Sequence, residues 1–458
     1  MAGDPHSPRP RHRVLLLAEV AHPEMVSVPL IGWCLSAALA RQAEVHLVTH
    51  IRNRDAITRQ GWREGAEFTV IDTEKLVRRL QQMAALIGAS DNRGWTIHQM
   101  FAPLGCIAFE RAAWKRFRPA LEAGRFDIVH RLTPMSPTTP SILGPRLRHL
   151  GIPFVVGPWN GGLPWPGGFT ARMHREREWL SQLRSLHTLL PGYRSMRKNA
   201  AAILAGSRHT LSEVPRYARA ASLYLPENGI DPTRFCKLRS RRATLPLRGA
   251  FVGRLVPYKC ADILILAATD LLREGKLHLD IIGDGPEREA LTRLIAELGV
   301  AQAVTLHGEV PHRQVQNLIV NCDFLACPSV REFGGGVVLE AMALGIAPIV
   351  ADYGGPAELI DTNTGIAVPF SGPDDLQENL RAILQDLIHD PARLDRLGDA
   401  AVARISALFT WERKAAQIVR VYDWVRSGYP KPDPFVEPGQ SPGTNPGDAA
   451  ATPVPSAG

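Results

Sequence analysis

Two glutamates around a run of three glycines form the part of the sequence best suited to bind a charged ligand that carries hydroxyl groups. Glu332 and Glu340 lie eight positions apart and flank Gly334, Gly335 and Gly336. Glycine lets backbone amides approach a ligand closely, and a helix that begins there favours negative charge. Carboxylates accept hydrogen bonds from hydroxyl groups. A tight turn would explain the glycines but not the glutamates, so the segment predicts a site for a diphosphate with neighbouring hydroxyls.

Two basic residues are candidate partners for such a diphosphate. Arg254 and Lys259 follow the apolar run at 248–253 by one and six residues, and Pro257 restricts the loop between them. Most Arg and Lys side chains are simply solvated on a protein surface. If these two bind the diphosphate, they would stabilise its charge as it departs, which is electrostatic catalysis.

The acidic, glycine-rich segment resembles the E-x7-E motif of family 4 glycosyltransferases, which have the GT-B fold. The resemblance is dense over about 200–428 and looser over 13–200. Other segments match the family in its order: PENGIDPTRF (226–235), FVGRLVPYK (251–259), IIGDGPERE (281–289), LHGEVPH (306–312) and LFTWERKA (408–415). The resemblance implies a retaining transferase that needs no metal or cofactor, and no D-x-D motif is placed to bind a metal.

Carried over to this chain, the resemblance implies that Glu340 binds the ribose hydroxyls of the nucleotide and that Glu332 contacts the transferred sugar. The glycine run, with Arg254 and Lys259, would bind the diphosphate. Gly283 and Gly285 would line the donor pocket from a turn at a strand end. A further candidate, Ser207, stands where the family often has a small polar donor contact, although a helix N-cap explains a serine there equally well.

The first half of the chain offers candidates for the acceptor side. The segment FDIVHRLTPMSPTTP (126–140) resembles a family strand that carries two histidines separated by one residue. Here His130 matches the first histidine, and Leu132 stands in the place of the second. His130 either replaces the missing catalytic histidine or is a histidine at a strand end. In the loop at 155–169, rich in Gly, Pro and Trp, three residues could line an acceptor site: Asn160, Gly161 and Gly162. A packed surface loop is the alternative.

Short apolar runs alternate with segments of helical periodicity along most of the chain, which is typical of parallel βαβ units. The expected strands are 14–20, 44–50, 126–130, 153–157, 201–206, 248–253, 278–283, 303–308, 322–328 and 347–351. A chain of 458 residues is too long for one core. We therefore expect an α/β protein of GT-B architecture, in which two Rossmann-like domains face each other across a cleft.

The expected domains follow from the composition and the resemblance. A polar tail at 1–12 precedes an acceptor-binding domain at 13–232, and a donor-binding domain follows at 233–405. A helix within 406–428 has one apolar face and, by the resemblance, crosses back to pack on the first domain. The Pro- and Gly-rich end at 429–458 is expected to be disordered.

The net charge of +8 favours an anionic partner: a nucleotide, an acidic membrane surface or nucleic acid. The resemblance selects a nucleotide sugar and gives no role to nucleic acid. The six cysteines form no CxxC pair, so neither a disulfide framework nor a zinc site is expected. Without a long apolar run or a signal-like N-terminus, the expected location is the cytoplasm. The basic, apolar segment 171–198 would suit peripheral contact with the inner membrane face and a lipid-linked acceptor, although a solvated helix face is the commoner reason for such a pattern.

Together these features predict a retaining glycosyltransferase that moves a sugar from a nucleotide-diphosphate sugar to an acceptor hydroxyl, in polysaccharide or glycoconjugate biosynthesis. Two alternatives remain open. One is a nucleotide-sugar epimerase of the same fold, which needs no separate acceptor. The other is a catalytically inactive sugar-nucleotide-binding subunit, which Leu132 makes conceivable.

Overall fold

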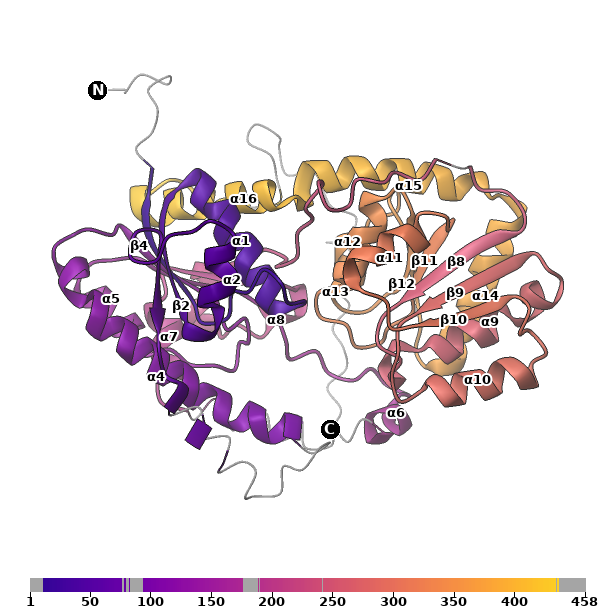
Figure 1. The fold of residues 1–458 in the computed structure, drawn as a ribbon, viewed down its shortest axis with the longest axis horizontal. Helices are drawn as coiled ribbons and strands as arrows, with labels where there is room; N and C mark the ends of the chain where they lie inside the picture. The colour runs from indigo at the N-terminus through magenta and orange to yellow at the C-terminus, as the bar shows by residue number, and fades with distance from the viewer. Residues whose placement is uncertain are drawn as a thin grey trace.

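The computed structural model describes residues 11–75, 78–79, 82, 94–175, 188, 190–240, 242–433 and 435. Within these residues the chain forms two α/β domains side by side, with the first half of the chain in one and most of the second half in the other (Figure 1). Each domain has one sheet in which every strand pair is parallel. The α/β fold class predicted from the alternating runs is confirmed.

The first sheet has seven strands in the order β3-β2-β1-β4-β5-β6-β7. Their bounds are β1 Arg13–Ala18, β2 Glu44–His50, β3 Phe68–Ile71, β4 Ile128–Thr133, β5 Phe154–Trp159, β6 Ala202–Ala205 and β7 Ser222–Tyr224. Strands β4 and β5 lie at the centre and are buried throughout, because helices cover both faces of the sheet. The helices in this half of the chain are α1 Val28–Gln42, α2 Arg54–Arg59, α4 Gly94–Glu122, α5 Gly144–His149, α6 Thr170–Arg175, α7 Tyr193–Asn199 and α8 Arg208–Ser212. Of these, α6 lies against the second domain (Figure 1).

The second sheet has six strands in the order β10-β9-β8-β11-β12-β13. Their bounds are β8 Leu247–Val252, β9 Leu277–Ile282, β10 Val304–Gly308, β11 Phe324–Cys327, β12 Ala347–Ala351 and β13 Ile366–Val368. The helices are α9 Ala261–Arg273, α10 Arg288–Glu297, α11 His312–Ile319, α12 Gly336–Ala343, α13 Gly355–Leu359, α14 Pro373–His389 and α15 Ala392–Arg404. The strand order reverses between β1 and β4 in the first sheet and between β8 and β11 in the second. Doubly wound proteins bind ligands at such a reversal.

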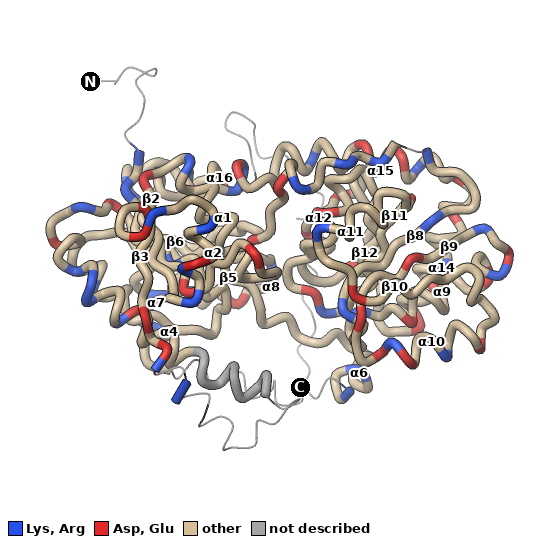
Figure 2. The backbone as a smooth tube through the Cα atoms, viewed as in Figure 1, with Lys and Arg blue, Asp and Glu red and all other residues tan. Residues whose placement is uncertain are grey.

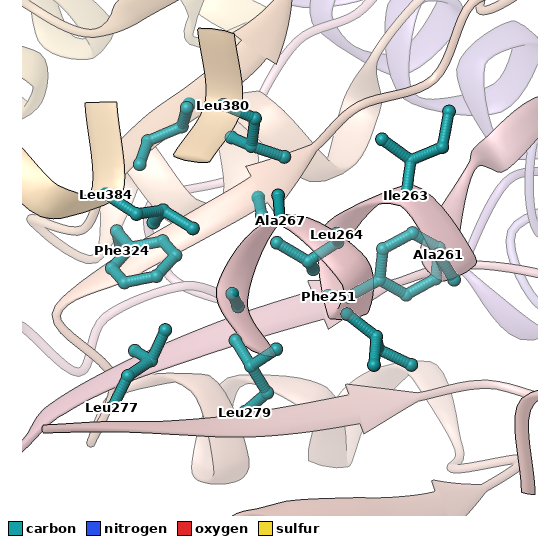
Figure 3. Close-up of a cluster of buried hydrophobic side chains, with 14 of the residues drawn as sticks. Phe251, Ala261, Ile263, Leu264, Ala267, Leu277, Leu279, Phe324, Leu380 and Leu384 are labelled. Atoms are coloured by element: carbon teal, nitrogen blue, oxygen red, sulfur yellow. The ribbon is translucent and has the colours of Figure 1, made fainter. Parts of the chain in front are cut away.

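Helix α9 anchors the core of the second domain. Its Ala261 and Leu264 lie beside Phe251 of β8, while Leu380 and Leu384 of α14 lie on the side of Phe324 of β11 (Figure 3). These residues are almost completely buried. Since burying one large apolar side chain contributes roughly 1.5–3 kcal/mol, this packing holds the carboxyl ends of the strands, and the loops that follow them, in fixed positions.

Two described segments that cross between the domains lie side by side. The first runs from the end of β7 at Tyr224 to the start of β8 at Leu247, and the second follows α15. The Ile230 amide donates to the Phe409 carbonyl (2.7 Å), and the Trp411 amide donates to the Ile230 carbonyl (3.1 Å). The last helix, α16 Trp411–Ser427, then packs on α1 of the first domain. The predicted return of this helix is therefore confirmed.

The segment 171–198, considered above as a membrane contact, lies outside the described residues at 176–187 and 189. At its described start, Arg172 of α6 forms a two-pronged ion pair with Asp262, and Arg175 pairs with Glu287. Both arginines thus contact the second domain. Figure 2 shows basic and acidic residues interspersed over both domains. In the described parts of the chain, no helix has both the length and the apolar character needed to cross a membrane. The expected disordered ends, apart from residues 11–12, 429–433 and 435, also lie outside the description.

Candidate active site

The glycine run forms a tightly packed turn between β11 and α12. Gly335 has a left-handed backbone (φ +62°) and stands just before the first helical residue, Gly336. A Cβ on Gly334 would lie only 2.3 Å from side-chain atoms of Glu227 and Asn228, so the position admits no side chain. The turn therefore brings successive backbone amides to the start of α12, as expected of an anion-binding loop.

Lys259 and Glu332 meet beside this turn although 73 positions separate them in the sequence. Lys259 Nζ donates to Glu332 Oε2 in an ion pair, and the side chains are only 12% and 22% exposed. Burial alone would lower the pKa of Lys259, but the Glu332 carboxylate holds it above its usual range. Lys259 is therefore a fixed positive charge at the edge of the glycine turn.

Arg254 lies on a loop that is tied closely to a second glycine turn. The Leu255 amide donates to the Asp284 carbonyl (2.9 Å), and the Glu287 amide donates to the Leu255 carbonyl (3.1 Å). A Cβ on Gly283 would lie 2.0 Å from the Gly253 carbonyl oxygen, so the two loops can approach only without one. Gly285 is packed against Leu255 in the same way. The side chain of Arg254 is exposed and has no hydrogen-bond or ion-pair partner among the residues that the structure describes.

Glu340 lies on α12 and is held by a histidine that sequence analysis did not single out. His312 Nε2 lies 2.6 Å from Glu340 Oε1, and the guanidinium of Arg234 donates to His312 Nδ1 at 2.6 Å. This pattern assigns the proton to Nε2, which donates to the carboxylate. His312 ends a segment that already matched the family, LHGEVPH, and its position there was the available signal.

His130 lies in the middle of the first sheet and is fully buried. Its Nε2 contacts the Gly157 carbonyl oxygen (2.7 Å), and its Nδ1 contacts the Tyr422 hydroxyl of α16 (2.7 Å). Burial lowers its pKa to about 4, so the ring is neutral at pH 7. Leu132 is also fully buried. Both ring nitrogens of His130 have partners inside the protein. The geometry therefore favours a structural role for His130 in the strand over a catalytic role.

The candidate acceptor residues form one loop that packs against α8. The Thr210 hydroxyl donates to the Gly161 carbonyl (3.1 Å), and a Cβ on Gly162, where φ is +85°, would lie 2.8 Å from the Glu213 carboxylate. Asn160 Nδ2 donates to Glu227. Ser207 caps α8, because its hydroxyl accepts from the Thr210 amide (3.1 Å). Ser207 thus acts as the N-cap of α8.

Glu227 is a second residue that sequence analysis missed. It follows β7, is 5% exposed, and accepts a hydrogen bond from Asn160 Nδ2 (2.5 Å). Burial raises its pKa to about 7, although the bond from Asn160 acts in the opposite direction. In the sequence it stands among ordinary polar residues, so nothing but the motif around it at 226–235 could have drawn attention to it.

Contacts between the domains bring the acceptor loop close to the donor loops. Arg331 Nε donates to the Leu163 carbonyl (3.3 Å), and the Tyr353 hydroxyl donates to the Pro164 carbonyl (3.0 Å). The acceptor loop therefore lies beside the donor segment that carries Glu332, whereas His130 is enclosed within the first domain. A separate hollow of about 240 Å³, lined by Arg239, Leu344 and Val402 among others, contains none of them.

Comparisons with known proteins point to one family. Residues 246–401 match the family model described as "Glycosyl transferases group 1". D-inositol 3-phosphate glycosyltransferase of Nocardia farcinica is 35% identical over 182 residues, which are 38% of this chain and 39% of that protein. Glycogen synthase of Mycobacterium tuberculosis is 30% identical over 47% of this chain and 51% of its own length. The chain thus aligns with about two fifths to one half of these curated relatives.

Similar folds occur among solved structures along most of the chain. HepE of Anabaena in complex with UDP aligns with a TM-score of 0.58 and 16% identity, over 90% of this chain and 99% of that one. Sucrose-phosphate synthase of Thermosynechococcus elongatus aligns with a TM-score of 0.56 and 18% identity, over 91% and 100%. At such low identity the likeness establishes the fold alone, and it confirms the two-domain GT-B architecture.

Proposed function

The chain belongs to the glycosyl transferases group 1 family, and on this premise we propose that it transfers a sugar from a nucleotide-diphosphate sugar to an acceptor hydroxyl with retention of configuration. One observation carries the proposal. Lys259 and Glu332 are paired beside a glycine turn at the start of a helix, so that a cation, backbone amides and a carboxylate occupy one place. A sugar diphosphate needs these three partners.

In the proposed reaction, Arg254, Lys259 and the amides of the glycine turn bind the diphosphate. Glu340 binds the ribose, and Glu332 orients the transferred sugar. The bond between the anomeric carbon and the phosphate oxygen breaks as the acceptor oxygen bonds to that carbon on the same face. The acceptor proton passes to the departing diphosphate. Charges fixed in advance stabilise this leaving group without reorganising at the moment of reaction.

We propose a uridine diphosphate sugar as the donor, because Anabaena HepE, which shares the fold, has been solved in complex with UDP-glucose. A thermal-shift panel of UDP-, GDP- and ADP-sugars tests this choice. A donor at 100 times its dissociation constant should stabilise the protein by roughly 2.7 kcal/mol. The UDP-sugar should raise the midpoint of unfolding in the wild type and raise it less in Glu332→Gln. If no member of the panel shifts the midpoint, the donor assignment is wrong.

A donor-only incubation separates the transferase from the other two activities. A transferase should release free sugar slowly without an acceptor and faster with one, since its domains exclude water from the reacting atoms. An epimerised sugar would identify the epimerase instead. A protein that binds the donor but never releases its nucleotide would be the inactive subunit. Loss of nucleotide release in Glu332→Gln would show that the turnover belongs to this site.

For the acceptor, we propose a sugar or a lipid-linked sugar in polysaccharide or glycoconjugate assembly, handled in the cytoplasm. The lipid-linked form would be reached through the basic segment 171–198. Arg172 and Arg175 are engaged by the second domain, and Arg197 is buried and donates to the Pro137 carbonyl. Other basic residues must therefore provide any attraction to lipid. Vesicles that contain anionic lipid should recover the protein by flotation, whereas recovery no greater than with neutral vesicles would argue against a membrane contact made by the basic segment.

A further inference from the structure

The carboxylate of Glu227 is wedged between a glycine of each domain. A Cβ on Gly334, in the glycine turn of the second domain, would lie 2.3 Å from Glu227 Oε1. A Cβ on Gly206, at the end of β6 in the first domain, would lie 2.4 Å from Glu227 Oε2. Real side chains never approach so closely, so both positions leave room for this one carboxylate. Glu227 thus fills the space between the two sheets at this point.

The polar contacts of Glu227 reach the first domain and the two segments that cross between the domains. Its Oε1 accepts hydrogen bonds from Asn160 Nδ2 and from Asn228 Nδ2 (3.2 Å). Asn160 is the first residue of the acceptor loop. Its Oε2 is buried and has no hydrogen-bond partner among the described residues. The ammonium group of Lys414, at the start of α16, is equally buried, lies over the rings of Phe409 and Phe435, and favours the charged carboxylate.

We propose that Glu227 is a positioning residue, which sets the distance between the acceptor loop at 160–162 and the donor glycine turn at 334–336. This inference rests on the proposed transferase function. Glu227 touches neither Arg254 nor Lys259, so we expect these two cations to bind the donor without it. The reaction needs the two loops in register, and a displacement of about 1 Å can lower turnover by a factor of about 100.

Three substitutions separate shape from charge. Glu227→Gln keeps the length and an oxygen that accepts from Asn160, whereas Glu227→Asp keeps the charge but is one methylene shorter. Glu227→Ala removes the wedge. We expect kcat for transfer to fall about 10- to 100-fold in the Asp and Ala variants, with the donor KM within threefold of the wild type. The Gln variant should retain at least half of kcat. Equal losses in Gln and Ala, or an unchanged kcat in Ala, would overturn the proposal.

Glu110→Gln provides the matched control for stability. Glu110 is also a buried carboxylate of the first domain, but it pairs with Arg131 away from the site. Its replacement should lower the midpoint of unfolding without separating kcat from KM. If it lowers kcat as Glu227→Ala does, the effect of Glu227 is general destabilisation and the positioning role is refuted.

A double-mutant cycle tests the wedge without any assay of activity. Gly334→Ala should lower the midpoint of unfolding more in the wild type than in Glu227→Ala, because the added methyl collides with the carboxylate only in the former. Relief is partial, since Asn228 Nδ2 also lies 2.3 Å from that methyl. Strictly additive shifts would refute the wedge. If the shifts are not additive but the protein turns over no nucleotide sugar, the proposed function is refuted and the contact between Glu227 and position 334 still holds.

Discussion

His312 Nε2 donates to Glu340 Oε1 across 2.6 Å, and this bond fixes the glutamate proposed to bind ribose. Hydrogen bonds to a charged group contribute about 1.5–3 kcal/mol. The histidine leaves the second carboxylate oxygen available for a ligand. Arg234 on the first crossing holds the other ring nitrogen, so the orientation of Glu340 depends on residues from two other segments.

Replacing His312 with alanine should therefore weaken donor binding. We expect the dissociation constant for UDP-glucose, measured by titration calorimetry, to rise about tenfold or more, because 1.4 kcal/mol corresponds to a factor of ten. His46→Ala is the control, since that ring is also bonded at both nitrogens but lies in β2 of the first domain. Equal affinity in the two variants would separate His312 from donor binding.

Lys259→Ala should lower turnover by roughly 100–1,000-fold and leave the fold intact, because one preorganised charge at a developing anion contributes about this much. Stopped-time assays of nucleotide release give kcat, and circular dichroism verifies the fold. Lys276→Ala is the matched substitution, since Lys276 is about half exposed and pairs with Glu274. A Lys259→Ala enzyme with near-wild-type kcat would contradict the assignment to the diphosphate.

His130 should affect stability against pH rather than catalysis. Its pKa is about 4 in the folded protein and about 6.5 in an unfolded chain. The unfolded state therefore binds more protons below pH 6.5, so the contribution of His130 is present above that value and is lost as the pH falls towards 4, by about 3 kcal/mol. The difference in unfolding free energy between wild type and His130→Asn should follow this window.

The same variant decides the role of His130 in the reaction. General acid–base catalysis contributes about 100- to 10,000-fold. We expect His130→Asn to retain kcat within tenfold at pH 7.5, provided that the protein is folded. A loss of 100-fold or more in a folded variant would restore the catalytic interpretation.

Gly335 and Gly299 form a pair that separates backbone strain from donor binding. Both have left-handed backbones, but a Cβ on Gly299 meets nothing within 4 Å, whereas one on Gly335 lies 3.1 Å from Pro356. Alanine at either position costs roughly 1–2 kcal/mol of strain. Only Gly335→Ala should also weaken UDP-glucose binding, by at least tenfold in the calorimetric titration. Equal affinity in both variants would show that the turn does not hold the diphosphate.

The sequence predicted the long βαβ pattern because buried parallel strands are continuous apolar runs, such as VLLLA in β1 and APIVA in β12. It did not predict β3, β7 or β13. The strands at Ser222–Tyr224 and Ile366–Val368 are three residues long, too short for any periodicity to be recognised. Their positions depend on pairing with a neighbour already in the sheet.

Glu332, Glu340 and the glycines could be found from the sequence because they are close together in it. Their pairing with Lys259 and His312 could not be found, since these two residues come from other βα units and only the folded sheet brings them near. The sequence also did not show which of the candidate side chains are buried. Nothing in a single sequence distinguishes His130, enclosed between β5 and α16, from a histidine at an open strand end.

The two crossings between the domains act as one hinge. Because Ile230 is hydrogen-bonded to Phe409 and Trp411, the outgoing and returning segments cannot bend independently. Two chain segments joined by hydrogen bonds resist shear and twist more than they resist bending about the axis that runs through the joined residues. We therefore expect any opening of the domains to be a swing about that line, with the donor and acceptor loops separating and returning along a single path.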